Sequence, residues 1–259
     1  MRFLLLLNLS LFPFLLGLSQ TAKEPSMAAD GSPRFEVAVI KQSDPNSTRQ
    51  GWSCESEGHH ITCVDITLDD IVAIAYGIHI KQIAGAPDWF AKAKFDVNGV
   101  PDLPGVPNAK QEQQMYQKLL ADRFHLVFHR EKREMPVYAI TIAKGGPILT
   151  PADPNATGSN TGNSGGSGFR TLKFTNISMA DLALNLSLYE DRPVIDQTSL
   201  TGRYNFSLKW TYDVSKEDGP GMPPSLFTAI KEQIGLRLDA VRRPAEVFVV
   251  DQVERPSDN

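Results

Sequence analysis

The sequence predicts an α+β protein that arose by tandem duplication, with a module of order β-α-β-β-α-β-β in each half. Three observations predict it. Short helical patterns alternate with strand-like patterns, a Gly/Ser/Asn-rich segment divides the chain, and several segments recur at a nearly constant offset. Most strands are expected to run antiparallel and to pack against short helices, because short helices and hairpins are mixed along the chain.

The first nineteen residues, MRFLLLLNLSLFPFLLGLS, have the composition of a secretory signal peptide. An arginine precedes an apolar run, and Gly17 and Ser19 have the spacing that a signal peptidase recognises, so we expect cleavage after Ser19. An uncleaved anchor helix is the alternative, which Pro13 and the shortness of the run disfavour. No later segment is long and apolar enough to span a bilayer, so the mature chain is expected to be soluble, either periplasmic or secreted.

Composition divides the remaining chain into four parts. Residues 20–33 are polar and rich in Pro, Ser and Ala, which is typical of a linker. A first module is expected over residues 34–151, a flexible loop over residues 152–168 and a second module over residues 169–259. The loop contains NATGSNTGNSGGSG, which has too few apolar side chains to form a core.

The two modules each begin with a helix of the same pattern. ITLDDIVAIAYGI starts at Ile66 and ISMADLALNLSLY starts at Ile177, at an offset of 111. Thr67 and Ser178 are the natural N-caps, and acidic residues follow in the first turn, where the helix dipole favours them. Apolar residues recur at helical spacing on one face: Leu68, Ile71, Val72 and Ala75 in the first helix, and Met179, Leu182, Ala183 and Leu186 in the second.

Three further segments repeat at a similar offset. KFDV at residues 94–97 matches RYNF at residues 203–206, and the predicted helix AKQEQQMYQKLLADRF matches PPSLFTAIKEQIGL. Each half then ends in a predicted hairpin, HLVFHREKREMPVYAITIA or RLDAVRRPAEVFVVDQV. Superposition of the modules is expected to place Ile66 on Ile177 and Val137 on Val247. Each copy is small for a core of its own, so the copies are expected to pack on each other.

The two cysteines, Cys54 and Cys63, occur in GWSCESEGHHITC. In an exported chain, cysteines this close favour a disulfide that closes a short hairpin-like loop. Free thiols are one alternative, and a metal site that includes His59 and His60 is another. The spacing matches no standard zinc motif, and adjacent histidines point to opposite faces of a strand. We therefore predict the disulfide, and neither a metal nor a cofactor.

The segment RPVIDQTSLTGRYNF, residues 192–206, has the composition of a functional loop, with an acid, hydroxyl groups, a glycine and an arginine. It takes the place of IAGAPDWFAKAKFDV in the first half, which has no equivalents of Asp196, Thr201 and Gly202. We therefore interpret it as a structural connection in which Asp196 or Thr198 caps a turn.

The sequence contains no motif of a known catalytic class. G-x-S-x-G, H-E-x-x-H and phosphate-loop patterns are missing, so no catalytic residue is predicted. The acidic pairs Asp69-Asp70 and Glu190-Asp191 lie at helix ends, without a visible partner that would shift a pKa. A net charge of -4 and a pI near 5.8 argue against a nucleic-acid partner. An enzyme would have to use Asp65, His59 and His60, brought together with another acid across a cleft.

Several long stretches carry a family resemblance: FEVAVIKQSDP, ITLDDIVAIAYGI, IAGAPDWFAKAKFDV, LLADRFHLVFHREKREMPVYAITIAKGGP, VIDQTSLTGRYNFSLKWTYD, SLFTAIKEQIGLRL and VFVVDQVERPSDN. From Arg34 to the C-terminus, the chain resembles the soil-associated secreted family of unknown function that is expanded in acidobacterial genomes. Some relatives are attached to membrane antirepressor-type metallopeptidase modules, which implies a sensory or regulatory accessory role. A distant likeness to the short N-terminal domains of secretins and TonB-dependent receptors implies periplasmic protein contacts.

These observations predict an exported, non-enzymatic binding or protein-interaction module, an accessory to envelope sensing, whose partner is an envelope protein or an extracellular ligand. An exported hydrolase of unfamiliar type is the alternative. A pocket that gathers two or more titratable groups would favour the enzyme, whereas an apolar groove would favour binding. The groove between the copies and the exposed strand edges are the expected contact surfaces.

Overall fold

A computed structural model describes residues 24–49, 51–156, 158–166, 168–212 and 221–256, so the predicted signal peptide lies outside the described residues. The first half contains β1 (Phe35–Gln42), β2 (Ser53–Glu57), β3 (His60–Thr67), α1 (Leu68–Tyr76), β4 (Ile83–Ala84), β5 (Lys94–Pro101), α2 (Ala109–Phe124) and β6 (Val127–Ile142). The second half contains β7 (Thr150–Pro151), β8 (Asn160–Gly166), β9 (Phe169–Ile177), α3 (Met179–Ser187), β10 (Val194–Asp196), β11 (Tyr204–Thr211), α4 (Leu226–Ile234) and β12 (Leu236–Gln252).

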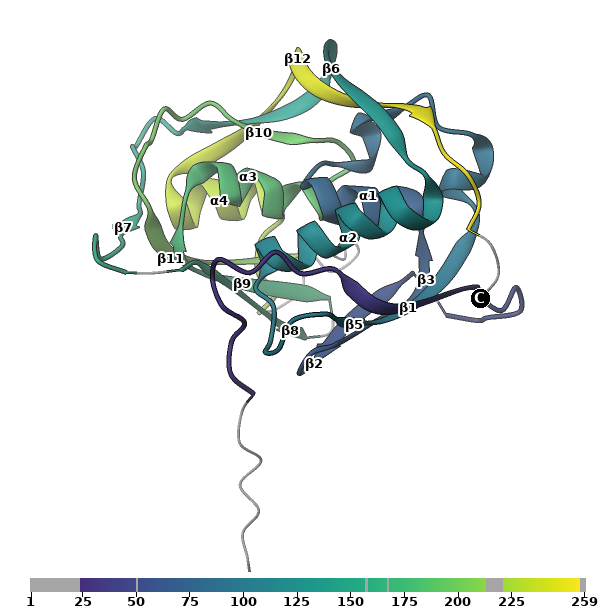
Figure 1. The fold of residues 1–259 in the computed structure, drawn as a ribbon. Coiled ribbons are helices and arrows are strands. Elements are labelled where there is room, and N and C mark those ends of the chain that lie inside the picture. The colour runs from purple at the N-terminus through teal and green to yellow at the C-terminus, as the bar shows by residue number, and fades with distance from the viewer. Residues whose placement is uncertain (1–23, 50, 157, 167, 213–220, 257–259) are drawn as a thin grey trace, which may run out of the picture.

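The predicted α+β class is confirmed. The strands form three four-stranded sheets with the orders β1-β5-β3-β2, β7-β11-β9-β8 and β10-β6-β12-β4. Pairing is antiparallel except where β10 joins β6 and β4 joins β12. Figure 1 shows α1 and α2 in one half of the molecule and α3 and α4 in the other, with the paired strands β6 and β12 arching over both. No helix of the described ranges is long and apolar enough to cross a membrane.

The paired strands β6 and β12 form a ribbon that replaces the hairpin predicted at the end of each half. Each is one continuous strand, and they pair from Ile142 and Leu236 at one end to Phe128 and Val250 towards the other. The period-two pattern of a hairpin and that of one long strand are the same, and the central HREKRE segment lacks a glycine that would favour a turn. The hairpin prediction was therefore wrong, and residues 129–134 lie within β6, opposite residues 244–249 of β12.

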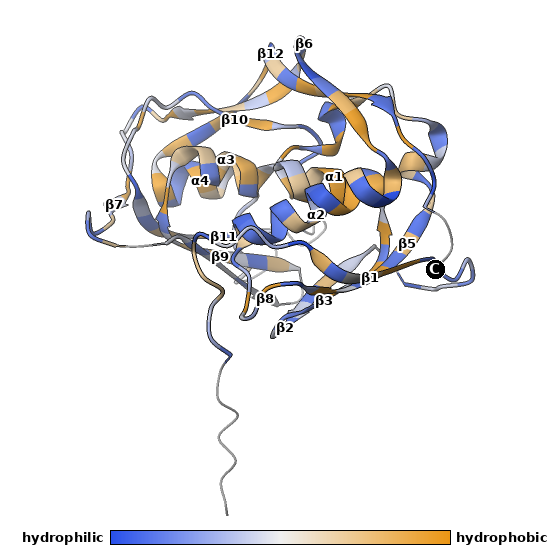
Figure 2. Cartoon of the chain, in the orientation of Figure 1, coloured by the Kyte–Doolittle hydropathy of each residue, from blue (hydrophilic) through white to orange (hydrophobic). Residues whose placement is uncertain are grey.

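Each end of the ribbon completes the core of a different half. Phe248 and Val250 of β12 pack into the cluster formed by α1, α2 and the sheet β1-β5-β3-β2. Ile140 of β6 packs with Leu236 and Leu238 into the cluster of the second half. Apolar residues accordingly gather on the inner sides of the helices and strands in Figure 2. The halves thus exchange strands, which links their stabilities.

The order of elements is the same in both halves, β3-α1-β4-β5-α2-β6 and β9-α3-β10-β11-α4-β12. Ile66 pairs with Phe95 in the first half, and Ile177 pairs with Tyr204 in the second. In the ribbon, Glu134 lies opposite Pro244, a residue 110 positions later, so equivalent positions face each other there.

Two segments differ from the linker and the loop that the sequence predicts. Residues 24–33 lie against the first half, where Met27 is buried and its N–H donates to the Val106 carbonyl. Within residues 152–168, β8 pairs with β9 from Asn160 to Gly166. An edge strand can form from small polar residues because backbone hydrogen bonds hold it without a buried side chain.

The cysteines lie opposite each other in the β2–β3 hairpin. A disulfide joins Cys54 and Cys63. Tyr116 of α2 donates its hydroxyl hydrogen to Cys63 Sγ across 3.2 Å. The hairpin is thereby attached to the buried face of α2.

Candidate functional site

A pocket of about 200 Å³ lies at the junction of the two halves. It is bounded by α1, by the chain that follows α1 and by the chain that follows α3. Its lining consists of Trp52, Asp70, Ala73, Ile74, Ile78, His79, Ile80, Ser187, Leu188 and Glu190. Six of these side chains are apolar, which favours binding, whereas Asp70, His79 and Glu190 meet the criterion of two or more titratable groups that favours an enzyme.

Helix α1 places one wall of this junction pocket. The Thr67 N–H and hydroxyl both donate to Asp70 Oδ2, which begins the helix. The helix buries Leu68, Ile71, Val72 and Ala75 in the core, so Ala73 and Ile74 are left towards the pocket. Gly77 ends the helix in the left-handed conformation, with φ of 60°, and turns the chain towards His79.

His79 joins the two halves at the back of the pocket. Its Nδ1 accepts from the Lys81 N–H at 3.0 Å, so Nε2 carries the hydrogen and donates to the Glu190 carbonyl oxygen at 3.1 Å. Burial lowers the pKa of His79. Both ring nitrogens of this neutral imidazole are occupied, so His79 positions the chain and is not free to act as a base.

Glu190 supplies a second carboxyl group to the pocket, in addition to that of Asp70. Burial, reinforced by the negative charge of Asp191, raises the pKa of Glu190 to about 7. Arg192 is directed to Asp191 instead, through hydrogen bonds of 3.0 and 2.8 Å. Within the described part of the chain, no hydrogen bond or ion pair reaches the Glu190 carboxylate. The sequence shows no partner that would raise this pKa, and the structure gives the two causes that do so, burial and the charge of the neighbouring Asp191.

The mouth of the pocket is apolar and exposed. Trp52 is 41% exposed, Ile80 40% and Leu188 64%. Single exposed apolar residues are common on protein surfaces, but three around one pocket form a patch of the kind found at binding sites.

The second half has different side chains at the positions that the predicted repeat aligns with the pocket. The N-caps Thr67 and Ser178 align α1 with α3, each nine residues long. Ala73 then corresponds to Leu184 and Ile78 to Tyr189. The small side chain of Ala73 therefore leaves space that the larger leucine would fill.

The residues considered for an enzyme are not brought together. Asp65 is 2% exposed, and its Oδ2 accepts from the Ser47 hydroxyl at 2.9 Å. His60 begins β3 and His59 precedes it, whereas Asp65 lies near the other end of the strand, roughly 16 Å away at about 3.3 Å per residue. His59 instead contacts Glu24. In the described ranges, no three His, Cys, Asp or Glu side chains are grouped to hold a metal ion.

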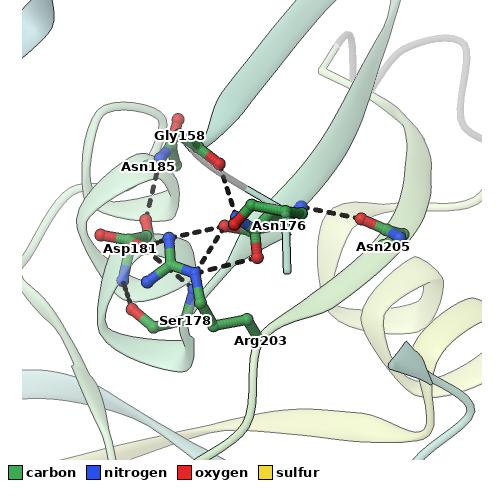
Figure 3. A network of polar contacts seen from close by, with 8 residues as sticks. Gly158, Asn176, Ser178, Asp181, Asn185, Arg203 and Asn205 are labelled. Carbon is green, nitrogen blue, oxygen red and sulfur yellow. Dashed lines mark hydrogen bonds and ion pairs between the residues drawn. The ribbon is translucent and has the colours of Figure 1, made fainter. Parts of the chain in front are cut away.

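Within the segment 192–206, Asp196 and Thr198 cap a turn, as the sequence predicts. Asp196 Oδ1 accepts from the N–H and the hydroxyl of Thr198, and the Thr198 hydroxyl oxygen accepts from the Leu200 N–H. Figure 3 shows the polar network that follows, in which Arg203 donates to the Asn176 carbonyl oxygen and approaches Asp181 at 3.5 Å. These contacts hold the start of α3.

Comparison with known proteins identifies one family. Residues 69–253 match the family model described as "Protein of unknown function (DUF3738)". The chain belongs to this family. No curated protein and no solved structure matches it.

The DUF3738 match covers the pocket unevenly. It begins within α1 and includes His79, Leu188 and Glu190, whereas Trp52 and the cysteines precede it. Sequence reasoning singled out Asp70 and Glu190 as members of acidic pairs, but it did not place them in one pocket with the apolar residues of the DUF3738 chain. The available signals were the apolar Ile78 and Ile80 on either side of His79, and the offset of 111 that separates His79 from Glu190.

Proposed function

We propose that this member of the DUF3738 family is an exported, non-enzymatic binding module. Its junction pocket accepts an apolar side chain of a protein partner in the cell envelope or outside the cell. The observation that carries the proposal is the apolar pocket between the halves, with Trp52, Ile80 and Leu188 exposed at its mouth.

The size of the pocket favours a side chain over a whole small molecule. Its volume of about 200 Å³ is below the 300–1,000 Å³ that is usual for small-molecule sites. A leucine or phenylalanine side chain would fill it, and the surrounding main chain of a partner would cover the exposed apolar mouth.

The polar groups of the pocket also favour binding. Asp70 is held by Thr67, and both nitrogens of His79 are engaged. Glu190 is then the one carboxyl group of the pocket that is available to act on a substrate. Acid-base catalysis needs a further positioned group beside it.

Export is supported by the composition of residues 1–19 and by the bonded position of Cys54 and Cys63, which suits an oxidising compartment. The family resemblance suggests that the partner belongs to envelope sensing.

Photo-crosslinking tests the proposal. A benzophenone amino acid at Leu188 should capture one reproducible partner from envelope extract, identified by mass spectrometry. The matched control is the same probe at Ile148, which is 61% exposed and outside the pocket. Equal products from both positions would refute the proposed site, and labelling of the chain by hydrolase activity probes would favour the enzyme.

A further inference from the structure

We propose that the partner presents a lysine or arginine next to the apolar residue that enters the junction pocket, and that this cation pairs with Glu190. The inference rests on the proposed function and deepens it, since it adds the charge of the partner segment.

The first step is the distribution of charge around the pocket. Two acids line it, Asp70 and Glu190, and Asp191 is adjacent. The positive charge of Arg192 lowers the pKa of Glu190, but burial and the charge of Asp191 outweigh this effect. Arg192 pairs with Asp191 and lies over the Tyr138 ring at 4.7 Å, and among the described residues Lys81 forms no ion pair with Glu190.

The second step is the environment of the carboxylate. Glu190 is partly buried, and the apolar side chains of Ile78, Ile80 and Leu188 line the same pocket. A charged carboxylate in such surroundings loses hydration without gaining a hydrogen bond, which disfavours its ionised form. A cation brought by the partner would offset this loss, and covering the mouth would strengthen the attraction by excluding water.

The third step is the choice among partner groups. A neutral amide could donate one hydrogen bond to Glu190, but it would not compensate the charge. A carboxylate would be repelled by Glu190, Asp70 and Asp191. A lysine or arginine is therefore the group that best complements this end of the pocket.

Three blocked peptides test the inference on the full mature chain. They share a central leucine and differ in the flanking residues, which are lysine, glutamine or glutamate. Binding is followed by NMR titration, with the indole signal of Trp52 as the reporter at the pocket. At low salt and pH 8, the lysine peptide should bind at least about fivefold more tightly than the glutamine peptide, and the glutamate peptide should bind most weakly.

Glu190→Gln keeps the shape of the side chain and removes its charge. In this variant the affinities of the three peptides should converge to within about twofold. If all three bind the unaltered protein equally, or if the lysine preference survives in Glu190→Gln, the inference is wrong while the proposed function stands. If none of them binds, both are contradicted. The dispersion of the NMR spectrum of Glu190→Gln establishes that the variant is folded.

Discussion

Nε2 of His79 lies 3.1 Å from the carbonyl oxygen of Glu190, and the two residues follow equivalent helices at an offset of 111. The contact joins the halves, and both residues line the junction pocket. It also brings together two groups whose pKa values shift in opposite directions, that of Glu190 upwards and that of His79 downwards.

The pH dependence of stability should contain a contribution from Glu190. Its folded pKa of about 7 lies above the ordinary value of 4.5, so the folded state binds more protons between these values. This contribution is therefore fully present below pH 4.5 and is lost as the pH rises through 7. His79 contributes in the opposite sense, since its lowered pKa makes the folded state lose stability as the pH falls.

Urea unfolding at pH 5, 6, 7 and 8 measures this effect. The groups near Glu190 are Asp70, His79, Lys81, Asp191 and Arg192, and all of them stay in place in Glu190→Gln. The variant should lose stability less than the unaltered protein between pH 5 and pH 8. Parallel curves for the two proteins would show that Glu190 does not titrate in this range.

The two halves should not fold separately. A fragment of residues 34–151 lacks Phe248 and Val250, which complete the core of the first half. We expect this fragment to be unfolded or aggregated by circular dichroism and NMR. In the full chain, Phe248→Ala should lower the free energy of unfolding by about 3–5 kcal/mol, and the variant should still unfold in a single transition. A well-dispersed spectrum of the isolated fragment would contradict the shared core.

Asn176 should be sensitive to substitution because of its conformation and its hydrogen bonds. It has φ of 52°, and its Nδ2 donates to the carbonyl oxygens of Ala156 and Gly158 at 3.2 and 2.5 Å (Figure 3). Asn176→Ala should lower the free energy of unfolding by about 2–4 kcal/mol, because it removes the side-chain hydrogen bonds and places an alanine in the left-handed conformation. The loss of unfolding free energy should be about 1 kcal/mol smaller for Asn176→Gly than for Asn176→Ala, because glycine adopts this conformation without strain. Equal losses in urea unfolding would exclude a strain contribution.

The cysteine pair should be oxidised in protein recovered from the periplasm or the medium. Peptide mapping without reduction should show Cys54 linked to Cys63, and the double change to serine should cost roughly 2–3 kcal/mol for a loop of this length. Two thiols that alkylate in native material would refute the bridge, and stoichiometric zinc that a chelator removes would favour the metal alternative.

The sequence predicted local structure more fully than it predicted long-range contacts. The starts of α1 and α3 follow from Thr67 and Ser178, because capping and helical periodicity depend on neighbouring residues. The long ribbon of β6 and β12 could not be predicted in this way, because one long strand and the two strands of a hairpin show the same alternation of apolar and polar residues. The contact of His79 with Glu190 depends on how the halves pack, so no local signal could place it.

The proposed duplication gains support from paired details. Asp65 and Asn176 both adopt positive φ, of 58° and 52°, and their N–H groups donate to Asp96 and Asn205 respectively. The same backbone conformation and the same type of hydrogen bond thus occur at both positions. Asn176 follows Asp65 by 111 residues, and Asn205 follows Asp96 by 109. The two halves differ at the pocket, where Ala73 has Leu184 as its counterpart.

Filling the junction pocket tests the central claim most directly. Ala73→Leu places in the first half the residue that the second half already carries, and Ala240→Leu makes the same change at an exposed position of β12. Affinity for the partner captured through Leu188 is then measured by isothermal titration calorimetry, with unfolding curves to show that both variants are folded. We predict at least about a tenfold loss of affinity for Ala73→Leu, or roughly 1.4 kcal/mol, and no change for Ala240→Leu. Unchanged affinity in a folded Ala73→Leu variant would contradict the assignment of this pocket as the binding site.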